Sequence, residues 1–157
     1  MPTSDASMSH AGTLVTAASL IAGFGSALIA FRLQRELDIE ERNEQRPAHL
    51  REHHWFPASD WLIVASNVAA LCLVVAPLVA LESPSQRLVQ FCSAICCAAA
   101  IMLAGYIPSI LAHYRFLVGL TEERSNPTFW EGVFLALTVV AALVAFAVVL
   151  HGAGSAS

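Results

Sequence analysis

The stretch GVFLALTVVAALVAFAVVL, residues 132–150, contains no Asp, Glu, Lys, Arg or His. A helix needs about 20 apolar residues to cross a hydrocarbon core about 30 Å thick, and this stretch has that length. Three more charge-free stretches of similar length lie at residues 11–31, 61–81 and 88–112. Backbone groups in lipid must be bonded within the segment, so each stretch should be helical. We therefore predict an all-α polytopic membrane protein with four transmembrane helices in an antiparallel bundle.

The composition of the whole chain agrees with a membrane location. It is 57% hydrophobic and 13% charged, whereas soluble domains carry roughly a quarter charged residues. The apolar stretches are continuous rather than alternating, which excludes the strands of a membrane β-barrel. We predict the lipid bilayer as the main partner, no nucleic-acid partner and no cofactor.

Arginine positions predict the orientation of the chain in the membrane. There is no lysine, and seven of the eight arginines lie in the loops at residues 32–60 and 113–131. Cytoplasmic loops collect basic residues, so we expect both of these loops to face the cytoplasm. The prediction is a multi-pass protein of the plasma (inner) membrane with both termini on the non-cytoplasmic side. Residues 1–10 and 152–157 are expected to be disordered outer tails flanking a transmembrane domain at residues 11–151.

The first helix should continue beyond the membrane. Residues 32–44 contain no Gly or Pro, and Arg32 and Glu36 are spaced to pair across one turn. We predict a continuous helix that projects into the cytoplasm until Pro47 ends it.

Four charged residues border the spans at their predicted cytoplasmic ends: Arg32, Asp60, His113 and Glu131. We expect this interfacial charge ring to form cross-helix pairs, each worth roughly 0–1 kcal/mol because the site should be wet. Ser59, just before the second span, is predicted to cap its helix through the side chain.

A second set of polar or small residues lies about six residues deeper, or roughly 9 Å at 1.5 Å per residue. This predicted polar layer consists of Ser26, Asn67, Tyr106 and Thr138. An unpaired Asn67 amide in hydrocarbon would cost a few kcal/mol, so we expect Tyr106 or Ser26 to be its partner. We interpret the layer as a set of helix–helix contacts in preference to a ligand or water site.

A histidine-rich segment follows the first helix. His49, Glu52 and His53 fit the H-x-x-E-H pattern of inverted zinc proteases. On a helix the three would share one face, as metal ligands must. That family places the motif in a large soluble domain, for which this chain has no room. We interpret the three residues as an interfacial cluster, and they remain the candidate metal ligands of the chain.

The same segment resembles a second family. Residues 46–50, Arg-Pro-Ala-His-Leu, are similar to the signature core of microsomal glutathione transferase-like membrane enzymes (the MAPEG family). Those proteins also have four spans, outer termini and a basic first cytoplasmic loop. The signature continues with asparagine and later glutamate, where this chain has Arg51 and His54. The resemblance implies a small membrane enzyme acting at the cytoplasmic face.

Two classes of function therefore remain open. No charge lies inside a span, which argues against a proton-coupled transporter. The first helix carries small residues at four-residue spacing, which favours close helix packing within a subunit, with a second copy or with a membrane partner protein. These residues are Ala18, Ala22, Ser26 and Ala30. We predict a non-enzymatic membrane component (scaffold, accessory subunit or oligomeric pore), with the MAPEG-like enzyme as the alternative.

Overall fold

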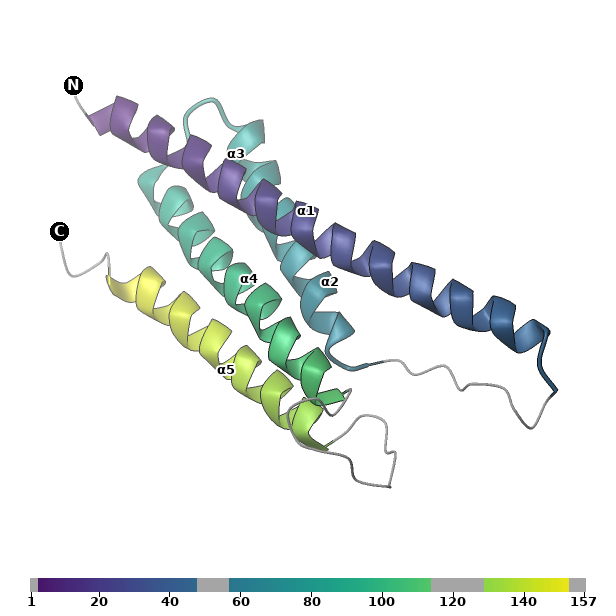
Figure 1. The fold of residues 1–157 in the computed structure, drawn as a ribbon. Coiled ribbons are helices and arrows are strands. Elements are labelled where there is room, and N and C mark those ends of the chain that lie inside the picture. Colours follow the sequence, from purple (N-terminus) through teal and green to yellow (C-terminus); the bar gives the residue numbers. More distant parts are fainter. Residues whose placement is uncertain (1–2, 48–56, 114–128, 153–157) are drawn as a thin grey trace.

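The computed structural model describes residues 3–47, 57–113 and 129–152, and every element in these ranges is a helix (Figure 1). The elements are α1 (Thr3–Glu44), α2 (Asp60–Val68), the π-helix η2 (Ala69–Val75), α3 (Ala76–Ala80), α4 (Gln86–His113) and α5 (Phe129–Gly152). Because α2, η2 and α3 follow one another without a break, we call them together the second span.

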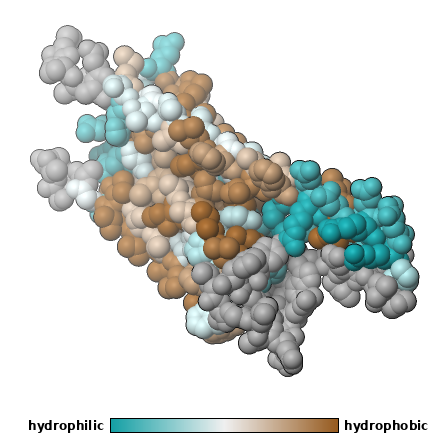
Figure 2. Space-filling view, viewed as in Figure 1, coloured by the Kyte–Doolittle hydropathy of each residue, from teal (hydrophilic) through white to brown (hydrophobic). Residues whose placement is uncertain are grey.

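Four helical segments are long and apolar enough to cross a membrane. They are Met8–Glu44, Asp60–Ala80, Gln86–His113 and Phe129–Gly152. Figure 2 shows the apolar surface around the middle of the molecule and the polar surface on the part of α1 that continues beyond the other helices. The prediction of an all-α four-helix membrane protein is confirmed.

Helix α4 lies at the centre of the bundle, where it packs against α5, the second span and α1. The start of α1 and the end of α5 lie at the same end of the bundle, which we call the terminal end (Figure 1). At the opposite end α1 runs on past the other helices. We call this the Glu131 end, because Glu131 lies there in the first turn of α5.

Helix α1 is longer than predicted at its start and agrees with the prediction at its end. It begins at Thr3, ahead of the predicted span that starts at residue 11. The helix already meets α4 in this part, where His10 Nε2 lies 3.4 Å from Ser93 Oγ. Beyond the span it continues to Glu44, as expected for a stretch without Gly or Pro.

The surface of α5 is typical of a helix that faces lipid. Large apolar side chains are exposed along most of its length, and α5 packs chiefly against α4. The exposed residues include Leu137, Val140, Leu143, Val144 and Val148. Aromatic residues mark its start, where Phe129 and Trp130 are exposed near the boundary that aromatic rings prefer.

Candidate functional site

Glu131 carries a fully buried carboxylate, with 0% exposure of the residue. Its Oε1 accepts hydrogen bonds from the Ser59 backbone N–H at 3.0 Å and from Ser59 Oγ at 3.2 Å. Its Oε2 lies 2.7 Å from Nδ1 of His113, which is itself buried. These three residues, the Glu131 junction, connect the beginning of the second span, the end of α4 and the beginning of α5.

The environment of Glu131 explains how a carboxylate can be buried there. A buried charge is costly unless donors surround it, and Ser59 and His113 supply three polar contacts. Glu131 also lies in the first turn of α5, where the helix dipole favours a negative charge. The predicted wet surroundings are not found for this pair, because Ser59 and Glu131 are fully buried and His113 is buried.

The other half of the charge ring joins α1 to the second span. Arg32 Nε lies 3.3 Å from Asp60 Oδ2, and Arg32 also pairs with Glu36 at 3.4 Å in its own helix. Tyr106 is buried close to Asp60, whose buried Oδ1 has no hydrogen-bond partner among the residues that the structure describes. The structure thus brings the four predicted residues together at one end, as two separate side-chain pairs, Arg32 with Asp60 and His113 with Glu131.

Ser59 has a role that the sequence did not indicate. It precedes α2 as expected, but its side chain makes no capping hydrogen bond. Its carbonyl accepts from the Leu62 N–H at 2.9 Å, and its hydroxyl points to Glu131 on another helix. The prediction of a side-chain cap is therefore wrong, because the Ser59 hydroxyl donates its hydrogen bond to the buried Glu131 carboxylate instead.

The predicted polar layer separates into unconnected contacts. Asn67 Nδ2 lies 3.4 Å from Ser26 Oγ, which is one of the two partners expected. Tyr106 lies close to Asp60, and Thr138 Oγ1 donates to the Phe134 carbonyl of its own helix at 2.8 Å. Counting residues from the boundary assumes parallel helices, whereas α1 crosses the bundle at an angle (Figure 1).

Two of these polar side chains fill spaces left by glycines. A Cβ atom added at Gly25 of α1 would overlap the Asn67 amide, and one added at Gly105 of α4 would overlap the Thr138 side chain. Small residues let transmembrane helices approach closely. Asn67 and Thr138 therefore mark two tight helix crossings, one between α1 and α2 and one between α4 and α5.

Polar contacts recur at seven-residue intervals along α4. Seven residues are close to two helical turns, so these positions share one face. From the terminal end, Cys92 Sγ lies 3.5 Å from the Leu73 carbonyl, and the Ala99 carbonyl accepts from Ser66 Oγ at 2.9 Å. The series continues through Tyr106 and ends at His113 of the Glu131 junction. The spacing Cys92, Ala99, Tyr106, His113 is visible in the sequence and could have identified this face.

The terminal end has its own contacts between α4 and α5. Gln90 Nε2 donates to the Leu150 carbonyl at 2.6 Å, and the Phe91 and Phe146 rings meet edge to face at 6.0 Å. Sequence reasoning did not single out Gln90. Its amide meets a carbonyl in the last turn of α5, where helix carbonyls lack partners within the helix.

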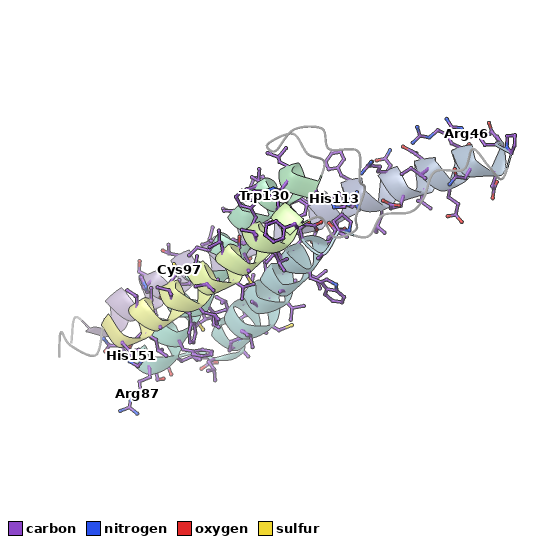
Figure 3. All side chains as sticks on the ribbon, turned by 90° about the horizontal axis from the view of Figure 1, so that it is seen from below. Arg46, Arg87, Cys97, His113, Trp130 and His151 are labelled. Atoms are coloured by element: carbon purple, nitrogen blue, oxygen red, sulfur yellow. The ribbon has the colours of Figure 1, made fainter. Side chains whose placement is uncertain are left out.

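Figure 3 shows the two ends of the bundle with their labelled side chains. His113 and Trp130 lie together where α1 leaves the bundle, and Arg87 and His151 lie at the opposite end. Within the residues that the structure describes, no group of three His, Cys, Asp or Glu residues could hold a metal ion. The candidate ligands His49, Glu52 and His53 lie outside the described residues.

Comparisons with protein-family models, with curated proteins and with solved structures gave no match to this chain. The chemistry of the described side chains therefore carries the functional proposal.

Proposed function

We propose that this chain is a non-enzymatic membrane component, a scaffold or accessory subunit. The supporting observation is that several of its buried polar groups bond to one another or to the main chain of neighbouring helices. Ser59, His113 and Glu131 bond to one another, and Ser66 and Cys92 contact main-chain carbonyls of neighbouring helices. A binding or catalytic site instead directs a few polar groups into a cavity.

The part of α1 beyond Arg32 is the surface that this component presents. Arg32 joins the start of this part to the second span through Asp60 and also pairs with Glu36 one turn further along α1. Leu33 and Leu37 are one turn apart and more than 60% exposed in this otherwise polar region. We infer that this exposed apolar pair is where a partner protein contacts α1.

Photo-crosslinking in native membranes tests this proposal. A photoreactive amino acid at Leu37 should give a discrete protein adduct, because a scaffold holds its partner at a fixed position. The matched control is the same amino acid at Val144, which α5 exposes to a similar extent. Val144 should give no protein adduct, because lipid covers that face. A Leu37 variant without an adduct would contradict a partner at this surface.

Glutathione binding distinguishes the proposal from the enzyme alternative. Purified protein in detergent should show no saturable heat on titration with reduced glutathione. Saturable binding that is lost on Arg46→Ala would favour the MAPEG-like enzyme, whose resemblance begins at that residue.

We also propose that the Glu131 end faces the cytoplasm, since the arginines of the loops support this orientation. A cysteine introduced at residues 155–157 should then react with an impermeant reagent added to intact cells. Reaction only after permeabilisation would reverse the orientation.

A further inference from the structure

One side of α1 is exposed both within the bundle and beyond it. Four exposed residues lie along this side at seven-residue spacing: Gly23, Ala30, Leu37 and Glu44. Seven residues are close to two helical turns, so the four share one face. A Cβ atom added at Gly23 would meet nothing within 4 Å, so none of the described helices packs there. We call this side the open face of α1.

Within the membrane span, the open face carries small residues. Gly23, Ala27 and Ala30 are exposed there, and small residues let another transmembrane helix approach the backbone closely. The neighbouring side of α1 carries large side chains instead, with Phe24 67% and Phe31 72% exposed. The open face is therefore the part of α1 against which a further transmembrane helix fits most closely.

Beyond the span, the open face is apolar and then acidic. Leu33 and Leu37 are 61% and 65% exposed, whereas Ile39, on the opposite side of the helix, is 5% exposed. At about 100° per residue, three exposed carboxylates lie within about 60° of Leu37. They are Glu40, Glu41 and Glu44. A chain that covers Leu33 and Leu37 thus also meets these carboxylates.

The charges of this face select the kind of chain that covers it. Within the described residues, no ion pair joins the three carboxylates to a basic side chain. The arginines of this part lie roughly 140–180° from Leu37 around the helix: Arg35, Arg42 and Arg46. A basic partner complements these carboxylates. A second copy of this chain does not, because it runs parallel in the same membrane and brings like charges together.

We propose that the open face binds a membrane protein whose transmembrane helix continues into a basic segment. The transmembrane helix packs on Gly23 and Ala30, and the basic segment covers Leu37 beside Glu44. With the Glu131 end on the cytoplasmic side, the segment that follows the partner's helix lies where Lys and Arg collect. This inference rests on the proposed partner contact at Leu33 and Leu37 and adds the chemistry of that partner.

Photo-crosslinking at two depths tests the inference in native membranes. A small diazirine amino acid at Ala30 should give an adduct with the same protein as one at Leu37, because one partner chain covers both positions. Phe31 is the matched control, since it is exposed at a similar depth on the neighbouring side, and should give no protein adduct. Peptide mapping should place the Ala30 crosslink in an apolar segment and the Leu37 crosslink in an adjoining segment rich in Lys and Arg.

Several results would overturn the inference while the Leu37 adduct still supports the proposed function. They are an absent Ala30 adduct, an Ala30 adduct with a different protein, and equal adducts at Ala30 and Phe31. An adduct between two copies of this chain, or a Leu37 crosslink in a segment without Lys or Arg, would equally rule out the basic partner.

Charge reversal provides a second measurement. Glu44→Lys should lower the yield of the Leu37 adduct about threefold or more, because it replaces an attraction by a repulsion. Lysine is favourable near a helix C-terminus, so this variant should fold. Asp38→Lys is the matched control, because Asp38 is an exposed carboxylate about 100° around the helix from Leu37. It should change the yield less than about twofold, and equal effects of the two substitutions would overturn the acidic contact.

Discussion

The two ends of the interface between the second span and α4 are held by different forces. At the Glu131 end, a buried carboxylate takes hydrogen bonds from Ser59 and His113, and Asp60 pairs with Arg32. At the terminal end, apolar packing dominates, and Cys92 makes a long contact with a carbonyl. Charge-assisted bonds are strong and directional, so they fix how the helices are rotated at the Glu131 end, whereas apolar packing constrains this rotation less.

This contrast follows from the solvent around the helices. Lipid chains are as apolar as leucine, so burial of apolar surface gives little drive for one helix arrangement over another. Hydrogen bonds and close contacts must then specify the arrangement. Where the chain supplies them, the second span is a regular α-helix, and where it supplies few, the π-helix η2 appears.

Glu131→Ala should have the largest effect, because it breaks the junction that fixes one end. Removing one partner of a buried pair leaves the others unpaired and costs about 3–5 kcal/mol. Denaturant unfolding in detergent measures the loss. Glu36→Ala is the control, since it removes a carboxylate from a partly exposed i,i+4 pair within one helix and should cost roughly 0.3–0.5 kcal/mol. Equal effects of the two substitutions would contradict a special contribution of the buried junction to the Glu131 end.

Gly105→Ala should have an intermediate effect. The added methyl group would overlap the Thr138 side chain, and overpacking of this kind costs about 1–3 kcal/mol. Gly23→Ala is the matched control, because its methyl group would meet open space and should change the stability by less than about 0.5 kcal/mol. Thermal unfolding of both variants makes the comparison, and a stable Gly105→Ala protein would contradict the close approach of α4 and α5.

Asn67→Leu should have the smallest effect. Its hydrogen bond to Ser26 is long, and interhelical bonds in membranes contribute about 0.6 kcal/mol on average. A loss of stability of this size, with the Leu37 photo-adduct retained, would assign Asn67 to helix packing. Loss of the adduct with folding intact would instead indicate a functional site at this position.

The sequence predicted the features that depend on the length and charge of single segments. The four spans follow from charge-free stretches, and the extension of α1 to Glu44 follows from the absence of Gly and Pro. The gathering of Arg32, Asp60, His113 and Glu131 at one end follows from their position at the span boundaries.

The remaining features depend on how each helix is rotated and tilted. The position of Glu131 next to a charge-free stretch placed it at a span boundary. That position does not show that its side chain faces Ser59 and His113 rather than water. Equal depth in the membrane suggested Tyr106 of α4 or Ser26 of α1 as the partner of Asn67, and the rotation of the helices selects Ser26. The π-helix was not predictable, because the apolar residues 69–75 suit a regular α-helix equally well.

A double-mutant cycle between His113 and Glu131 tests the central claim most directly, namely that the Glu131 junction holds three helices together. The unfolding free energies of His113→Ala, Glu131→Ala and the double variant are measured in the same detergent. The two substitutions remove one shared contact at 2.7 Å, so the account predicts strong non-additivity, with an interaction energy of about 2–3 kcal/mol. Effects that add to within about 0.5 kcal/mol would show that the two side chains are not coupled and would contradict the account.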